Sequence, residues 1–266
     1  MIIDFHTHIF PDKLAAHAMQ VLKKNASVHS DCDPTKEDLL RTMDECGIDK
    51  AVVLNIVTKE SQHEDVLRFA KKTDSERLIA FGSVMPDSPH ALEYIWKASD
   101  EGLKGLKFHP ALQRVYPAEK KYFPLYDLAR ALNLIVTFHA GWDPSYPDEI
   151  NATPQSMKVI AENFPGLRVI AAHMGGMKLT QEVFDDIAGK ADIYMDTAYC
   201  AHSWIDKDIL EKIINRHGAE KILFASDFPW DRPSKELDII RSLSITDEQK
   251  QLILGGNAAR LLGIQK

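Results

Sequence analysis

The sequence has 266 residues, of which 45% are hydrophobic and 27% charged, a balance typical of a globular protein with a sizeable core. The formal charge of -7, with lysines and arginines scattered along the chain, argues against a polyanion-binding surface, so we expect no nucleic-acid partner. Three cysteines are too few for a disulfide framework, no apolar stretch approaches bilayer length, and the first residues do not resemble a signal peptide. We therefore expect a cytoplasmic protein with no membrane association.

Short β-branched runs alternate with longer amphipathic stretches along the chain. The predicted strands are Ile2–Phe5, Ala51–Asn55, Ile79–Val84, Gly105–Phe108, Leu134–Phe138, Arg168–Ala172, Ile193–Asp196 and Ile222–Ala225. The predicted helices are Glu37–Cys46, Glu64–Lys72, His90–Ser99, Pro124–Leu132, Pro154–Asn163, Gln181–Ala188, Lys207–Arg216 and Lys235–Ser242. Such alternation, with nearly continuous apolar strands, indicates a parallel sheet covered by helices.

Eight strand–helix units predict an α/β fold of the (β/α)₈ or TIM-barrel type, with one domain over residues 1–266. A doubly wound open sheet is the competing arrangement, but it usually carries a glycine-rich phosphate turn after its first strand, and none is present here. Gly47 and Gly102 follow helical patterns as C-terminal caps would, and Pro154 suits a first helical position. Asn257 is expected to cap a terminal helix that packs on the barrel.

Two histidines, His6 and His8, close the first predicted strand. Residues i and i+2 of a strand point the same way, so the two imidazoles can converge on one metal ion. Later strands also end in potential ligands, and the carboxyl ends of all barrel strands open onto one face. The residues expected on that face are His6, His8, Lys107, His109, His139, His173 and Asp227.

Each of these residues also has a plain structural interpretation. A single histidine at a strand end is more often hydrogen-bonded structure than a ligand. Asp227 can form an Asx turn before Pro229, His109 can simply end a strand, and Lys107 can be a solvated surface lysine. A shared site is favoured because so many potential ligands coincide at strand ends. The residues alone do not separate His139 from His173 as the ligand.

Six motifs together resemble the amidohydrolase superfamily, in the amidohydrolase-2 branch that includes aminocarboxymuconate-semialdehyde decarboxylase. They run in family order over essentially the whole chain. The motifs are Asp4-Phe5-His6-Thr7-His8, Gly105-Leu106-Lys107-Phe108-His109-Pro110, Phe138-His139-Ala140-Gly141, Ala172-His173-Met174-Gly175-Gly176, Ser226-Asp227-Phe228-Pro229-Trp230 and Gly256-Asn257-Ala258-Ala259-Arg260-Leu261-Leu262.

The resemblance implies that His6, His8, His139 and Asp227 ligate the metal and that His173 is the catalytic histidine. Imidazoles with a carboxylate suit Zn²⁺ first, with Mn²⁺, Fe²⁺ or Co²⁺ as alternatives, and we expect one ion per chain. In other branches of the superfamily a carboxylated lysine after the fourth strand bridges two ions, which leaves that role open for Lys107.

A site of this kind predicts a hydrolase in which metal-bound hydroxide attacks a small, carboxylated substrate, with Asp227 and His173 handling the proton. Decarboxylation is the alternative that the resemblance permits. The absence of a long inserted lid favours hydrolysis. A barrel that binds a metal or ligand without turnover is a third hypothesis.

Substrate contacts are expected from the loops, and they are the least specific part of this prediction. The candidates are Lys107, His109, Arg114, Trp142, Tyr199 and Arg232. The partner is a small-molecule substrate, whose identity the sequence does not give, and homo-oligomerisation stays open.

Overall fold

The computed structural model describes residues 1–26, 30 and 32–264, and within these the chain forms eight parallel strands. The strands are β1 (Ile3–Thr7), β2 (Lys50–Leu54), β3 (Leu78–Phe81), β4 (Gly105–Phe108), β5 (Ile135–Phe138), β6 (Arg168–Ala171), β7 (Tyr194–Asp196) and β8 (Ile222–Leu223). All eight were predicted, and the boundaries differ from the prediction by at most three residues.

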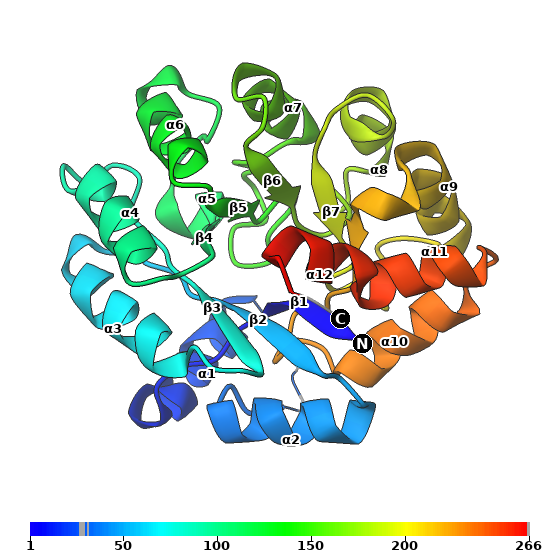
Figure 1. Cartoon of the computed structure of the whole chain (residues 1–266), viewed down its shortest axis with the longest axis horizontal. Coiled ribbons are helices and arrows are strands. Elements are labelled where there is room, and N and C mark those ends of the chain that lie inside the picture. Colours follow the sequence, from blue (N-terminus) through cyan, green and yellow to red (C-terminus); the bar gives the residue numbers. More distant parts are fainter. Residues whose placement is uncertain (27–29, 31, 265–266) are drawn as a thin grey trace.

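The strands close into a barrel. β1 to β3 and β4 to β8 form two hydrogen-bonded groups in sequence order. A bridge between Gly82 and Leu106 joins the groups on one side, and a bridge between Thr7 and Phe228 joins them on the other. Figure 1 shows this ring of strands with the helices around its outside. The predicted (β/α)₈ fold is confirmed, and the open doubly wound sheet is wrong.

The helices cover the outer face of the barrel and make its larger core with it. They are α1 (Asp12–Ala26), α2 (Lys36–Cys46), α3 (His63–Thr73), α4 (Ala91–Asp100), α5 (Pro110–Gln113), α6 (Phe123–Ala131), α7 (Pro154–Asn163), α8 (Thr180–Glu182), α9 (Lys207–His217), α10 (Pro233–Ser242), α11 (Asp247–Gln251) and α12 (Asn257–Leu262). None of the described helices is long and apolar enough to cross a membrane.

Two helix ends lie at the residues that the sequence predicted to mark them. Gly47 ends α2 in the left-handed conformation, and the hydroxyl of Thr153 caps α7 ahead of Pro154. The prediction missed α1, α5 and α11. It also gave one helix over Gln181–Ala188, where α8 passes instead into a π-helical turn at Val183–Ile187.

Asn257 does not cap the terminal helix as predicted. The chain is already helical before Asn257, because a π-helical turn over Leu252–Gly256 leads directly into α12. The buried amide of Asn257 instead donates hydrogen bonds to the carbonyl oxygens of Ala219 and Ile222, both 2.7 Å away. Asn257 therefore fastens α12 to the start of β8.

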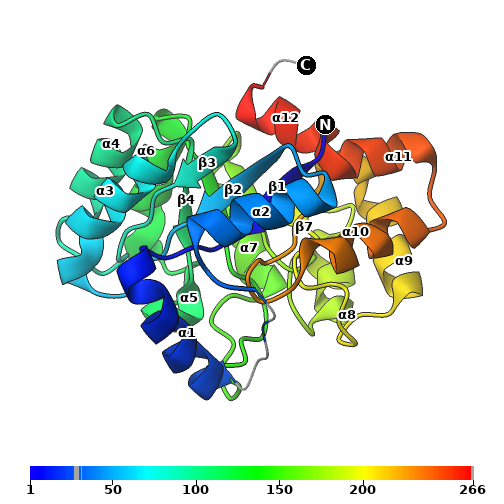
Figure 2. The same ribbon diagram turned by 90° about the horizontal axis from the view of Figure 1, so that it is seen from below.

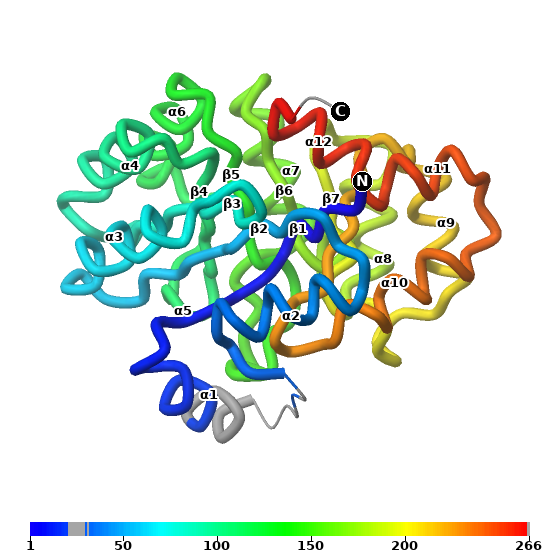
Figure 3. Tube along the Cα trace, turned by 60° about the horizontal axis from the view of Figure 1, so that its bottom comes forward, coloured from blue at the N-terminus to red at the C-terminus, as the bar shows by residue number. Residues whose placement is uncertain are grey.

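α12 closes the end of the barrel opposite to the loops that follow the strands. Ala258 and Leu261 of α12 belong to a second core cluster with inward residues of the strands, such as Ile3 and Phe5. Figures 2 and 3 show α12 and the N-terminus together at one end of the barrel, away from α1 and α5. The carboxyl ends of the strands face the other way, toward α1 and α5.

Candidate metal and catalytic site

His6, His8 and Asp227 bring three ligand atoms together where β1 ends and β8 leads into its loop. Asp227 Oδ1 lies 3.4 Å from Nε2 of His6 and 3.4 Å from Nε2 of His8, and the two Nε2 atoms are 3.1 Å apart. Ligand atoms about 2.1 Å from a tetrahedral ion are separated by about 3.4 Å. The three atoms thus have the spacing of a coordination shell.

Backbone hydrogen bonds hold these residues in place across the seam of the barrel, which is the junction between β1 and the segment that follows β8. The Asp227 N–H donates to the His6 carbonyl oxygen at 2.9 Å, and the His8 N–H donates to that of Phe228 at 2.6 Å. Asp4 accepts from the hydroxyl and the N–H of Ser226, which ties β1 to the same turn. Because of this pairing, the two histidines and Asp227 approach from opposite sides of the seam.

Both histidines of β1 present Nε2 to the site. His6 donates Nδ1–H to Asp196 Oδ2 at 2.9 Å, and His8 donates Nδ1–H to the Leu54 carbonyl oxygen at 2.8 Å. Each Nε2 therefore keeps its lone pair. Burial, and after it the nearby charge of Lys107, lower the pKa of His6 well below its usual value. A neutral imidazole with a free Nε2 is the form that binds metal.

Asp196 was not among the predicted site residues, although it closes the predicted seventh strand. It is fully buried, and its Oδ1 accepts from the N–H of His173 at 2.8 Å and of Ala198 at 3.2 Å. Burial raises the pKa of its carboxyl, while His173 and Lys107 act in the opposite direction. The same signal that singled out the histidines, a polar residue at a strand's carboxyl end, also applies to Asp196.

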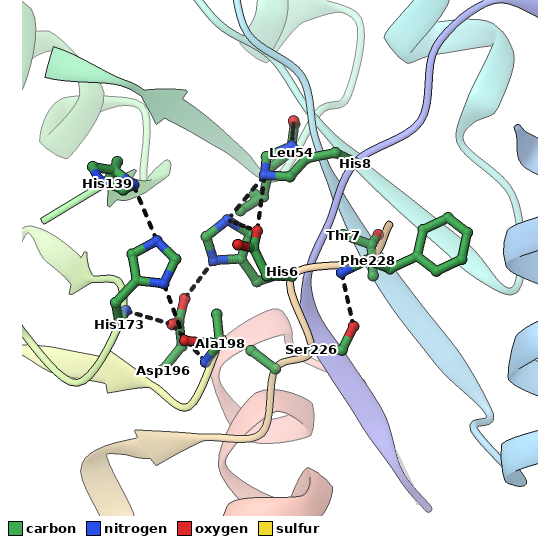
Figure 4. A network of polar contacts seen from close by, with 12 residues as sticks. His6, Thr7, His8, Leu54, His139, His173, Asp196, Ala198, Ser226 and Phe228 are labelled. Atoms are coloured by element: carbon green, nitrogen blue, oxygen red, sulfur yellow. Dashed lines mark hydrogen bonds and ion pairs between the residues drawn. The ribbon is translucent and has the colours of Figure 1, made fainter. Parts of the chain in front are cut away.

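His173 lies between His6 and His139 (Figure 4). Its ring centroid is 5.2 Å from that of His6 and 4.7 Å from that of His139. His173 donates Nδ1–H to the Ala198 carbonyl oxygen at 3.0 Å, which leaves Nε2 facing His139 Nδ1 at 3.0 Å. His139 is not within the compact group of His6, His8 and Asp227, but it adjoins that group through His173.

Left-handed backbone conformations bring both catalytic candidates to the site. His173 has φ 55°, followed by Met174 at φ 51°, and Asp227 has φ 66°. Such conformations are uncommon outside glycine and cluster at functional sites. At His173 the strain is offset by the hydrogen bond from its N–H to Asp196.

Lys107 is fully buried and lies in the interior of the barrel, so its interpretation as a solvated surface lysine is wrong. Its Nζ lies 3.2 Å from His6 Nε2. Burial lowers the pKa of Lys107 from 10.5 to about 8, against the opposing effect of Asp196 and Asp227. A lysine with this pKa can hold or release a proton near neutral pH.

A second group of side chains adjoins His139. His109 stacks on His139 with ring centroids 4.3 Å apart, and Asp143 lies beside both rings. All three are buried, and their ligand atoms lie within 4.8 Å of one another. Asp143 was not predicted; an acidic residue four positions after a strand-end histidine is the signal that could have found it.

The remaining predicted substrate residues lie in loops or at helix ends. Among the described residues, no hydrogen bond, ion pair or ring contact joins them to the site histidines His6, His8, His139 and His173. Trp142 lies under Lys178, whose Nζ is 3.2 Å from the ring centroid, and Tyr199 stacks on His202 at 3.7 Å. Arg232 forms an ion pair with Glu45 of α2, and Arg114 is exposed at the end of α5.

The family model for amidohydrolases matches residues 3–264. The chain belongs to the amidohydrolase family. No curated protein matches it. This amidohydrolase is structurally similar to an uncharacterized TIM-barrel protein from Bordetella bronchiseptica, with 18% identity, a TM-score of 0.78, and coverage of 99% of this chain and 98% of the other.

Two similar structures are decarboxylases. The 5-carboxyvanillate decarboxylase of Sphingomonas paucimobilis is 17% identical, with a TM-score of 0.71 and 99% of each chain covered. The dihydroxybenzoic acid decarboxylase of Polaromonas sp. JS666, with bound manganese and the inhibitor 2-nitroresorcinol, is 17% identical, with a TM-score of 0.74 and coverage of 100% of this chain and 97% of that one. At these identities the likeness establishes the barrel fold alone.

Proposed function

We propose that this amidohydrolase binds one divalent ion per chain and decarboxylates a small carboxylated substrate without an oxidant. The observation that carries the proposal is the convergence of His6 Nε2, His8 Nε2 and Asp227 Oδ1 at coordination spacing. His139 is proposed as the fourth ligand. The donor set fits zinc first, and manganese is supported by the ion bound in the Polaromonas enzyme.

Hydrolysis, the reaction first expected from the sequence, becomes the second candidate. The expectation depended on the absence of an inserted lid. This chain is structurally similar over 99–100% of its length to two decarboxylases. These two named structural relatives favour decarboxylation over hydrolysis.

The bound ion would supply Lewis acidity toward the substrate's carboxylate and a neighbouring oxygen. In decarboxylation the carbon–carboxyl bond breaks, CO₂ leaves, and the electron pair that stays on carbon takes up a proton. His173 is proposed to deliver that proton through Nε2, because its Nδ1 is held by the Ala198 carbonyl oxygen. Asp227 would hold the ion and take part in the same proton transfer.

Lys107 is proposed to face the carboxylate of the substrate, since its ammonium is buried beside His6. His109, Trp142 and Tyr199 are further candidates for substrate contacts. Arg114 and Arg232 are weaker candidates, because Arg114 is exposed and Arg232 is engaged with Glu45. Carboxylation of Lys107 remains the alternative, and it would bring a second ion.

The product of the reaction tests this proposal. The protein, reconstituted with Mn²⁺ or Zn²⁺, is incubated with hydroxybenzoates and with small esters, lactones and amides in ¹⁸O-labelled water. Release of CO₂ with no labelled oxygen in the organic product is the expected result. Labelled product without CO₂ would establish the hydrolase instead.

A barrel that binds an ion without turnover would give neither product. His173→Asn separates this case from an enzyme, because the variant should keep its ion and lose turnover. His217→Asn is the matched control, since His217 lies on α9 and its Nε2 contacts the Ile193 carbonyl oxygen. We expect the control to keep both the ion and the activity.

A further inference from the structure

In the group formed by His109, His139 and Asp143, the function proposed above gives no role to Asp143. Asp143 Oδ2 lies 3.4 Å from His109 Nε2 and 3.7 Å from His139 Nε2. The Nε2 of His139 is buried and has no hydrogen-bond partner. A buried polar atom without a partner costs about 1–3 kcal/mol, so its surroundings call for an explanation.

The hydrogen bonds of His109 fix which of its nitrogens carries the hydrogen. The backbone N–H of Leu112 donates to His109 Nδ1 at 3.4 Å, in the first turn of α5. Nδ1 is therefore an acceptor, and the neutral ring carries its hydrogen on Nε2, which faces Asp143. Asp143 Oδ2 thus lies 3.4 Å from an imidazole nitrogen that carries a hydrogen.

The position of the hydrogen on His139 depends on which of its two nitrogens binds the ion. Its Nδ1 faces the lone pair of His173 Nε2 at 3.0 Å, on the side toward His6. If Nδ1 is to bind an ion, the neutral ring must carry its hydrogen on Nε2. In the described part of the chain, Asp143 is the carboxylate recorded within 4 Å of that nitrogen.

We propose that Asp143 is a positioning residue that accepts the Nε2–H of His139 and so directs His139 Nδ1 to the metal. This inference rests on the proposed metal-dependent function. The role matches that of Asp196 toward His6, in which a carboxylate fixes a histidine by its outer nitrogen. Each carboxylate would make its histidine a better ligand.

The loop that carries Asp143 is built to hold the carboxylate in place. Asp143 Oδ1 accepts the N–H of Ser145 at 2.7 Å. The preceding residue, Trp142, donates its N–H to the Met177 carbonyl oxygen at 3.0 Å, and Gly141 donates to that of Ala152 at 2.7 Å. The carboxylate therefore starts from a fixed backbone, and a small movement of the His139 ring would complete the hydrogen bond.

A second metal ion held by His109, His139 and Asp143 is the rival interpretation of this group. The spacing would allow it. The hydrogen bond from Leu112 opposes it, because a metal on His109 Nε2 would force the ring's hydrogen onto Nδ1, against the N–H of Leu112. The geometry therefore favours Asp143 as a hydrogen-bond acceptor.

Metal affinity and the position of the hydrogen on His139 test the proposal together. Zn²⁺ affinity is measured by competition with a chromophoric chelator for the wild type, Asp143→Asn and Asp143→Ala. The matched control is Asp148→Asn, which changes an exposed aspartate of the same loop. ¹⁵N NMR of the Zn²⁺-loaded protein, with His139→Gln to assign its signal, reports which nitrogen of His139 carries the hydrogen.

We expect Asp143→Asn to weaken Zn²⁺ binding 10–100-fold, and the control to leave it unchanged. The asparagine amide can donate to His139 Nε2 and so favour the wrong tautomer, so Asp143→Asn should be at least as harmful as Asp143→Ala. In the wild type the hydrogen should lie on Nε2.

Three results would overturn the inference. They are wild-type Zn²⁺ affinity in Asp143→Asn, a His139 hydrogen on Nδ1 in the wild type, and loss of a second ion when His109 or Asp143 is changed to alanine. Failure of the proposed function gives a different result, since the wild type would then bind no ion.

Discussion

Replacing Lys107 with methionine should stabilise the metal-free protein at neutral pH. Burial lowers the pKa of Lys107 from 10.5 to about 8, a difference of 2.5 units. Each unit corresponds to 1.36 kcal/mol, so the buried ammonium costs about 3 kcal/mol of folding stability while both states are protonated. Methionine has a similar length and carries no charge to desolvate.

The pH dependence of this gain follows from proton binding. Below pH 8 the lysine is protonated in the folded and the unfolded state, and the full cost is present. Between pH 8 and 10.5 the unfolded chain binds more protons than the folded one, so the stability of the wild type rises with pH. The advantage of Lys107→Met should therefore shrink over this range.

Urea denaturation in the presence of a chelator, followed by tryptophan fluorescence, measures this difference at pH 7, 9 and 10. Lys104→Met, a change of an exposed lysine just before β4, controls for the loss of a lysine as such. We expect the free energy of unfolding of Lys107→Met to exceed that of the wild type by about 3 kcal/mol at pH 7. A difference that stays constant from pH 7 to 10 would refute the reasoning.

Three further changes probe the site and the scaffold. Asp196→Asn should weaken metal binding 10–100-fold, as measured by chelator competition, because His6 Nδ1 loses its carboxylate acceptor. Unchanged metal affinity would show that Asp196 does not position His6. Gly141→Ala should destabilise the protein by more than 1 kcal/mol in urea, because Gly141 has φ +89° and an added Cβ would lie 2.1 Å from the Met177 nitrogen; a wild-type midpoint would contradict this. Asn257→Ala should cost about 2 kcal/mol by leaving two buried carbonyl oxygens without their donor, and a loss under 0.5 kcal/mol would argue against that role.

The barrel could be predicted from the sequence because its signal is repeated. Each strand is a short apolar run and each helix an amphipathic one, and Gly105–Phe108 and Pro154–Asn163 were predicted with the boundaries found. α1 escaped prediction because the region between the first two strands was assigned a single helix, α2. Asn257 was misread because a π-helical turn before it is invisible to sequence patterns.

The candidate site was only partly predictable. A histidine at a strand end can be recognised from periodicity, as His6 and His8 were. Asp196 is hydrogen-bonded to His6, a residue far away in sequence, and Asp143 lies beside His139 in a loop, so neither could be paired with its histidine from strand periodicity. His173 also depends on its backbone, whose left-handed conformation no periodicity predicts.

The metal content of the purified, reconstituted protein tests the central claim most directly. The wild type is compared with His6→Ala and Asp227→Ala, with His217→Asn as the control. The account predicts about one zinc or manganese ion per chain in the wild type and the control, and none in the two site variants. Retention of the ion in both site variants, or no uptake by the wild type, would contradict it.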